Sequence, residues 1–298
     1  MNLKTLDQIV ELAAKRSTRR IAVAAADDKH VLKAIKKASE MKLIKPLLVG
    51  DESKIRSLSA SIGLHLEDED IIHEPDPAKA CITAVKEIRQ GKADILMKGM
   101  VATAPLLKAV LNKEEGLRKR NNLSHFALFQ TSFYHKLIGV TDAAMNIAPE
   151  LDDKKAIIEN AAEVFHSFDI SNPKIAIIGP VEVVNPKISS TLDAANLTQM
   201  NRRKQIKSCI IDGPLAIDNA VSKEAAEQKG IESEVAGDAD ILVAHDLNSG
   251  NILYKTMIFL SDARSAAVIL GAKVPIVLTS RADSEETKLF SIALAASI

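Results

Sequence analysis

A serine, an arginine and an aspartate follow the last apolar run of the chain. The run at 274–278 has the composition of a buried strand, and Ser280, Arg281 and Asp283 come just after it, ahead of a helical pattern. The planar guanidinium of Arg281 suits two parallel hydrogen bonds to a phosphate, and a helix N-terminus adds N–H groups and partial positive charge. We expect Arg281 to face a phosphate, and Ser280 to cap the helix beginning near residue 283 or to contact the ligand.

A second group of polar residues occupies the segment DLNSGNILYK at 246–255. Asn248 or Ser249 would suit the N-cap of a helix predicted over 249–261, and Gly250 would let a ligand approach the backbone closely. The residues that we expect to line a binding site here are Asp246, Asn248, Ser249, Gly250, Asn251 and Lys255.

Short β-rich runs alternate with amphipathic stretches along the whole chain, which is typical of parallel sheets with crossover helices. In the first part, strands are predicted at 20–26, 46–50, 70–74 and 93–99, and helices at 28–42, 51–62, 76–90 and 103–112. Later strands are predicted at 174–180, 208–214, 239–246 and 274–280, and later helices at 152–168, 186–206, 222–230, 249–261 and 263–271.

The rhythm breaks at two runs, 125–131 and 136–142, that only four residues separate. Such spacing predicts an antiparallel hairpin and marks a change of domain. We expect two doubly wound α/β domains, one formed by 1–124 plus 275–298 and the other by 125–274. Ligands of such sheets bind beyond the carboxyl ends of the strands. Polar residues recur at those ends: Lys98-Gly99, Thr141-Asp142, Gly179-Pro180, Asp212-Gly213-Pro214, His245-Asp246 and the segment from Ser280 to Asp283.

Composition excludes several classes of protein. The 298 residues carry 39 basic and 39 acidic side chains, so no global field favours nucleic acid or anionic membranes. Aromatic residues make up 3%, which argues against base-stacking platforms. The N-terminus resembles a surface helix rather than a signal peptide, and no apolar window is long enough to span a membrane. We therefore expect a cytoplasmic protein in which Cys81 and Cys209 are reduced, buried thiols.

Several catalytic motifs are missing. No glycine-rich dinucleotide fingerprint follows the first strand, and the chain has no P-loop or G-x-S-x-G elbow. The seven histidines show no spacing suited to zinc. Metal catalysis and covalent catalysis are therefore not supported.

Four segments together resemble the phosphate acetyl/butyryltransferase family. They are GVTDAAMNIAP (139–149), DGPLAIDNAVS (212–222), DLNSGNILYK (246–255) and VPIVLTSRADS (274–284), and the match runs from about residue 93 to the C-terminus. The third segment is the most specific, and the second and fourth are more similar to the butyryltransferase branch than to the acetyltransferase branch.

This resemblance implies two α/β domains around a cleft, as in isocitrate and isopropylmalate dehydrogenases, and a homodimer. It implies reversible transfer of a short acyl group between coenzyme A and inorganic phosphate, with coenzyme A as a substrate and no tightly bound cofactor or metal. Ser280 would then contact the thiolate or the carbonyl oxygen. Lys98, Thr103 and Asn146 match binding positions of the family loosely. The basic runs 117–120 and 202–204 could hold the phosphates of coenzyme A, although solvated helix faces are the ordinary interpretation.

The chain differs from the acetyltransferase branch at the residue expected to act as the general base. The acetyltransferase pattern has an aspartate seven residues after the serine, where this chain has Thr287. On a continuous helix, Asp283 would share a face with Thr287, so we expect Asp283 to act as base or positioning group, with Glu286 as the alternative.

Two other functions remain open at this stage. One is a metal- and NAD-dependent decarboxylating dehydrogenase of the same fold, for which the expected aspartate cluster is not recognisable. The other is a protein that binds coenzyme A or acyl phosphate without turnover. The preferred acyl chain is not readable, because one methylene is worth only about 1–3 kcal/mol of discrimination.

Overall fold

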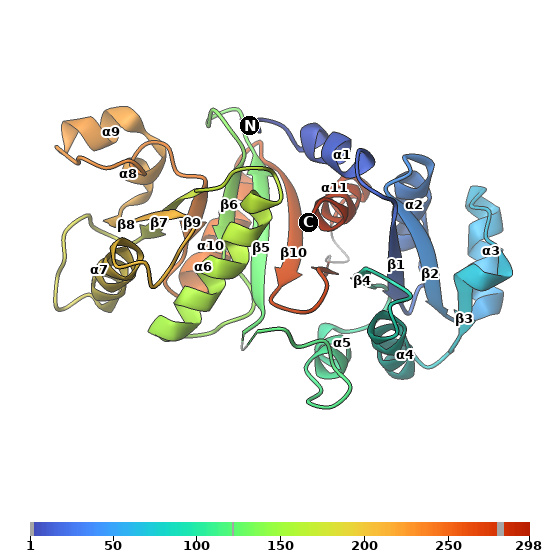
Figure 1. The fold of residues 1–298 in the computed structure, drawn as a ribbon. Coiled ribbons are helices and arrows are strands. Elements are labelled where there is room, and N and C mark those ends of the chain that lie inside the picture. The colour runs from blue at the N-terminus through green and yellow to red at the C-terminus, as the bar shows by residue number, and fades with distance from the viewer. Residues whose placement is uncertain (1–2, 121, 279–282) are drawn as a thin grey trace. The chain divides into compact units, whose positions relative to one another are not determined.

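The computed structural model describes residues 3–120, 122–278 and 283–298. The chain divides into two compact units, here called the central unit (1–6 with 121–265) and the outer unit (7–120 with 266–298). The boundaries expected from the sequence, after residues 124 and 274, lie four and nine residues further along the chain, and residues 1–6 were expected in the other domain. Both units are mixed α/β structures in which parallel strand pairs dominate, so the predicted fold class is confirmed (Figure 1).

The outer unit is built on strands in the order β3-β2-β1-β4-β11-β10. Neighbours pair in parallel except β10 and β11, which are antiparallel. The strands are β1 (Arg19–Ala24), β2 (Ile44–Gly50), β3 (Ile71–His73), β4 (Ile95–Lys98), β10 (Arg264–Leu270) and β11 (Ile276–Val277). The helices are α1 (Leu6–Ala14), α2 (Lys29–Glu40), α3 (Glu52–Ile62), α4 (Pro77–Arg89), α5 (Thr103–Val110) and α11 (Glu285–Ala296), with a 3₁₀ turn at Asp68–Asp70.

Aspartates fix the starts of three of these helices. Asp28, Asp51 and Asp76 precede α2, α3 and α4, and each carboxylate accepts a hydrogen bond from a backbone N–H of the first turn. These bonds satisfy donors that have no partner within the helix. The caps explain why these predicted helices begin within a residue or so of their observed starts.

The central unit has the strand order β5-β6-β9-β7-β8. β5 and β6 pair antiparallel, which confirms the predicted hairpin, and the other neighbours are parallel. The strands are β5 (Ser124–Gln130), β6 (Ile138–Thr141), β7 (Lys174–Ile178), β8 (Ile210–Leu215) and β9 (Ile241–Val243). The helices are α6 (Leu151–His166), α7 (Ser189–Arg202), α8 (Ile217–Val221), α9 (Lys223–Gln228) and α10 (Leu247–Leu260). In Figure 1, α6 covers the near face of β5 and β6, and α10 lies behind them.

The helix predicted at 263–271 is wrong, because most of this segment forms strand β10. Residues Val268 and Ile269 are almost fully buried and β-branched, and Ile269 pairs with Ile276. β-Branched residues pack well on a pleated surface, and pairing with β11 overrides the local helical pattern.

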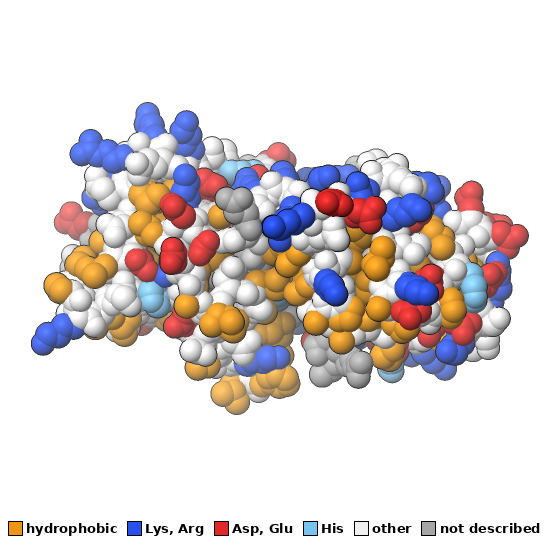
Figure 2. Space-filling view, turned by 90° about the horizontal axis from the view of Figure 1, so that it is seen from below, with side chains coloured by type: hydrophobic (Ala, Val, Ile, Leu, Met, Phe, Trp, Pro, Cys, Tyr) orange, Lys and Arg blue, Asp and Glu red, His pale blue; other side chains and the backbone are white. Residues whose placement is uncertain are grey.

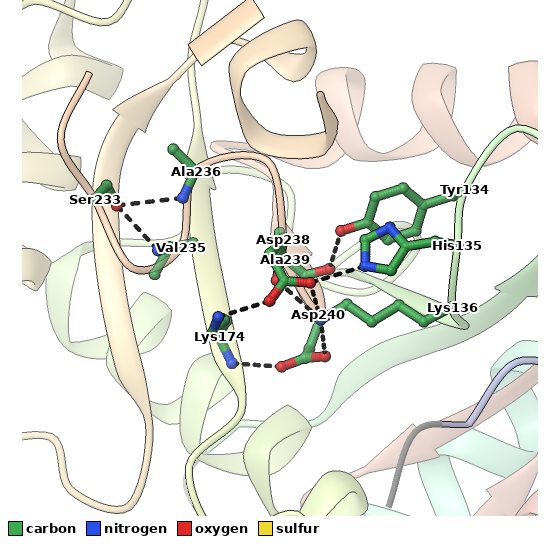
Figure 3. A network of polar contacts seen from close by, with 10 residues as sticks. All are labelled: Tyr134, His135, Lys136, Lys174, Ser233, Val235, Ala236, Asp238, Ala239 and Asp240. Carbon is green, nitrogen blue, oxygen red and sulfur yellow. Dashed lines mark hydrogen bonds and ion pairs between the residues drawn. The ribbon is translucent and has the colours of Figure 1, made fainter. Parts of the chain in front are cut away.

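A charged network joins the amino ends of β6, β7 and β9 (Figure 3). The ammonium of Lys136 lies 2.9 Å from Asp238 and 2.7 Å from Asp240, and Lys174 reaches Asp238 at 2.6 Å. Burial opposes ionisation of Asp238, but hydrogen bonds from Lys136, Lys174 and His135 outweigh it and hold the pKa of this carboxyl well below its usual range. The network therefore fastens these three strands at the edge opposite their carboxyl ends.

None of the helices among the described residues combines the length and apolar character needed to cross a bilayer.

Candidate active site

The predicted site residues belong to both units, and each unit is described separately. In the outer unit, Lys98 ends β4 and is 7% exposed. Its ammonium donates to the carbonyls of Gly99 (3.3 Å) and Val101 (3.1 Å). A Cβ on Gly99 would lie 2.0 Å from the carbonyl oxygen of Ala25, so glycine is needed where the ends of β4 and β1 touch. Thr103 is the partly exposed first residue of α5.

Ser280 and Arg281 lie outside the described residues, and the chain is described again from Asp283. Helix α11 begins at Glu285, with Ser284 as its N-cap, whose hydroxyl accepts from the N–H of Thr287 at 3.0 Å. The helix is therefore capped by Ser284, and the prediction that Ser280 caps it is wrong. Asp283 precedes the helix, so it does not share a helical face with Thr287 as expected.

Lys288 was not predicted as part of the site. It is 4% exposed, and its ammonium donates to the backbone carbonyl of Asp283. The signal in the sequence was a lysine at a position where the helical pattern predicts an apolar, buried side chain. The contact ties Asp283, the residue before the N-cap, to α11.

In the central unit, Asp142 organises the loop after β6. Its buried carboxylate accepts from the backbone N–H groups of His125, Ala144, Met145 and Asn146, all at 3.0–3.1 Å. The amide of Asn146 donates to this carboxylate and, at 2.8 Å, to the Leu123 carbonyl. The side chain of Asn146 therefore holds the loop, a different use from the ligand contact expected of it.

Asp246 is the N-cap of α10. Its carboxylate accepts from the N–H of Ser249 at 2.8 Å, and the Ser249 hydroxyl contacts the N–H of Asp246 at 3.2 Å, which completes a capping box. The Ser249 N–H, ahead of other causes, lowers the pKa of Asp246. The prediction that Asn248 or Ser249 is the cap is wrong, because the helix begins two residues earlier than expected.

Gly250 lies against the protein's own backbone. A Cβ there would stand 2.1 Å from the carbonyl oxygen of Asp142, so the missing side chain lets α10 approach the end of β6. The missing side chain thus serves packing within the unit, and close approach of a ligand to the Gly250 backbone stays a prediction. Asn251 reinforces the contact by donating to the Ala143 carbonyl at 3.1 Å.

Asn248 and Lys255 are the exposed polar side chains of this segment together with Ser249. The ammonium of Lys255 lies 5.5 Å from the ring centroid of Tyr254, which packs edge-on against His125 at 5.2 Å. Burial lowers the pKa of His125 to about 4, and its Nδ1 has no hydrogen-bond partner among the described residues. The first turns of α10 thus place exposed polar side chains near a neutral, buried imidazole.

A cluster that sequence reasoning missed lies at the same edge of the central unit. Lys154 of α6 is 2% exposed, and its ammonium lies 2.6 Å from Asp193 of α7 and 3.1 Å from Nδ1 of His245. His245 follows β9 and borders a cavity of about 540 Å³. Its place at a strand end was the available signal, but no spacing in the sequence links it to residues 154 and 193.

Among the described residues, no group of three or more histidine, cysteine, aspartate or glutamate side chains is arranged to hold a metal ion.

Comparisons with known proteins agree on one family. The family model described as phosphate acetyl/butaryl transferase matches residues 4–80 and 69–296. A phosphate butyryltransferase of Clostridium acetobutylicum is 46% identical over 294 residues, which cover 99% of this chain and 98% of that one.

Solved structures extend the comparison. The crystal structure of a branched-chain phosphotransacylase from Enterococcus faecalis V583 has a TM-score of 0.84 at 33% identity, covering 94% of this chain and 98% of that one. A 4-hydroxythreonine-4-phosphate dehydrogenase from Burkholderia phymatum has a TM-score of 0.57 at 14% identity, covering 95% and 98%, and this likeness shows the fold alone. The chain therefore belongs to the phosphate acetyl/butaryl transferase family.

Proposed function

We propose that the protein catalyses the reversible reaction of an acyl-CoA with inorganic phosphate to give an acyl phosphate and free coenzyme A. The observation that carries this proposal is the family match over nearly the whole chain. The relatives described as a butyryltransferase and a branched-chain phosphotransacylase favour butyryl or branched short chains as the acyl group.

Both substrates bind together in the proposed mechanism, and phosphate attacks the thioester carbonyl directly. Such transfer needs a phosphate held in line, stabilisation of the carbonyl oxygen and control of the thiol proton. We assign the phosphate to Arg281, because its guanidinium can donate two parallel hydrogen bonds. Ser280 donates to the thiolate or the carbonyl oxygen, and Asn248, Ser249 and Lys255 contribute to substrate binding. No tightly bound cofactor takes part.

Asp283 is the proposed base or positioning group for the thiol, since Thr287 has no carboxylate. Asp283→Asn keeps the size of the side chain and removes the base. We expect kcat to fall by about 100-fold or more, because general acid–base catalysis typically contributes about 10²–10⁴-fold. Steady-state kinetics will decide it, with Glu286→Gln measured alongside because Glu286 is the alternative base. A kcat of Asp283→Asn within about twofold of wild type would exclude this role.

The direct test of the function is phosphate-dependent release of thiol from butyryl-CoA, measured with a thiol reagent. Burial raises the pKa of Cys81 and of Cys209 to about 11, so the enzyme's own thiols contribute little background. The rate should vanish without phosphate. Release of thiol that is indifferent to phosphate, or none across acetyl-, propionyl-, butyryl- and isobutyryl-CoA, would remove the transferase assignment and leave a binding protein. NAD reduction would indicate the dehydrogenase alternative.

We also propose a homodimer. Several large apolar side chains are mostly exposed to solvent. Figure 2 shows apolar side chains in groups between charged ones on one face of the molecule. We assign the dimer contact to these side chains, because exposed apolar residues that gather into a patch mark a surface used for association. The most exposed are Phe133 (84%), Leu260 (82%), Ile147 (76%) and Phe259 (69%). The cytoplasmic location expected from the sequence stays a prediction.

A further inference from the structure

Lys154 fixes which nitrogen of His245 carries a proton. A lysine ammonium has donors only, so at 3.1 Å Nδ1 of His245 must accept from it. The neutral imidazole therefore carries its hydrogen on Nε2. Asp193, whose carboxylate is 2.6 Å from the ammonium, holds the lysine in place. The cluster presents His245 as a hydrogen-bond donor at Nε2.

The surroundings keep this imidazole neutral. Burial lowers the pKa of His245, and the nearby charge of Lys154 lowers it further, against weaker opposing effects of Asp193 and Asp246. A proton on Nδ1 would also point at the lysine ammonium. The Nε2 donor is therefore uncharged at neutral pH.

The donor borders a largely apolar cavity. Nε2 lies 3.4 Å from the hydroxyl of Ser189, an exposed contact at the first turn of α7. The cavity of about 540 Å³ is bounded by the ends of β7 and β9 and one face of α10. Its polar rim includes Asp246, Ser249 and Thr256, and its apolar walls are Ile178, Pro180, Ile217, Ile252 and Leu253.

These properties select a neutral, flexible ligand with carbonyl groups. The Asp246 carboxylate on the rim disfavours an anion, the apolar walls favour methyl and methylene groups, and the Nε2 donor requires an acceptor oxygen. Coenzyme A contains one segment of this kind, the pantetheine arm with its two amides and paired methyl groups. We propose that this cavity binds the pantetheine arm of coenzyme A and that His245 Nε2 donates to one of its amide carbonyls. The proposal rests on the proposed function, because that function supplies coenzyme A as the substrate.

Calorimetric binding of coenzyme A and of adenosine 3′,5′-bisphosphate, which lacks the arm, tests the proposal without turnover. His245→Phe removes the donor, and we expect the Kd of coenzyme A to rise about tenfold, as for a lost hydrogen bond, with the Kd of the bisphosphate unchanged. His245→Gln keeps an N–H donor and should recover part of the affinity. His65→Gln, an exposed histidine in the outer unit, is the matched control.

Wall and positioning residues supply independent variants. Ile252 is 67% exposed, so Ile252→Trp should fold normally while it narrows the cavity and weakens coenzyme A binding. Lys154→Met leaves His245 beside Asp193 and Asp246, so the pKa of His245 should rise, and coenzyme A affinity should begin to change at a higher pH than in wild type as the pH is lowered from 7. Thermal unfolding checks that each variant is folded.

The outcomes separate the two proposals. Unchanged coenzyme A affinity in His245→Phe and Ile252→Trp, or an equal loss for the bisphosphate, overturns the cavity assignment even if the enzyme turns over butyryl-CoA. Selective loss of coenzyme A affinity in a protein without turnover supports the cavity and refutes the transferase. If light scattering shows that Ile252→Trp changes only the oligomeric state, the cavity is a subunit contact and the proposal fails.

Discussion

At the scale of single residues, the polar side chains near the strand ends differ in whether they already have hydrogen-bond partners within the protein. Asp142, Asn146 and Asn251 make hydrogen bonds to nearby backbone groups, whereas Asn248 and Lys255 have exposed side chains. Residue type alone could not separate these groups, because an asparagine that holds a loop and one that binds a ligand look alike in a sequence. Contact partners in the fold decide between the two roles.

Arg281 is the residue for which side-chain geometry matters most. Arg281→Lys keeps the charge but loses the two parallel hydrogen bonds, so we expect KM for phosphate to rise about 10- to 100-fold, with a smaller change for acyl-CoA. Initial rates at varied phosphate will measure it. Arg203→Lys, an exposed residue in the basic run 202–204, is the control and should behave as wild type. A phosphate KM equal to wild type in Arg281→Lys would contradict the assignment.

At the scale of elements, the residue at which a helix starts decides whether a candidate site residue lies before the helix, at its N-cap or within it. The sequence predicted the existence of most helices and strands, because capping aspartates and apolar runs are local signals. It failed where the answer depends on distant partners. Strand β10 forms by pairing with β11. The start of α11 at Glu285 was missed for a different reason, because its local cap Ser284 was passed over in favour of Ser280. These failures moved Asp283 off the helix and removed Ser280 as its cap.

Gly250 tests how tightly α10 is held to the end of β6. In Gly250→Ala the new Cβ would meet the Asp142 carbonyl at 2.1 Å, so the backbone must shift, at a cost of about 1–3 kcal/mol of unfolding free energy. Urea unfolding measures the loss. Asn248→Ala, an exposed change on the same helix, should stay within about 0.5 kcal/mol of wild type. Equal stability of the two variants would show that the close approach is not needed.

Lys136→Met tests the network at the amino ends of β6, β7 and β9. The change leaves Asp240, which is mostly buried, without its ion pair, and we expect a loss of about 1–3 kcal/mol at pH 7, since Asp238 is partly exposed. The pKa of Asp238 is depressed in the folded state, so its contribution is present above about pH 4 and is lost as pH falls further. The difference from wild type should therefore shrink at pH 3. A loss independent of pH would show that packing of the lysine chain, not charge, matters.

At the scale of the whole molecule, each unit contributes its own set of strands, and the residues assigned to the reaction come from both. The α/β class followed from the alternation of apolar runs, and the activity followed from four segments with the order and spacing of the family. The cluster of Lys154, Asp193 and His245 could not follow from either, because it joins three elements that are far apart in the sequence. Tertiary structure was needed to see it.

Association is the prediction that belongs to this scale. We expect sedimentation equilibrium to give twice the mass of one 32.2 kDa chain at micromolar concentration. The double variant Phe259→Ser, Leu260→Ser removes two large exposed apolar side chains of α10 and should shift the mass toward one chain. A wild type that sediments as a single chain would contradict the dimer.

The Asp142 loop has a consequence for the thermodynamics of substrate binding. Its carboxylate and the capping box of Asp246 order the backbone at the start of α10 before any ligand arrives. Binding of a ligand there costs little conformational entropy of the loop backbone. More of the interaction energy therefore remains to distinguish one acyl group from another. The backbone at the start of α10 is thus ordered in advance of binding. Selectivity among short acyl chains should therefore depend on the shape of the acyl group and not on closure of a loop.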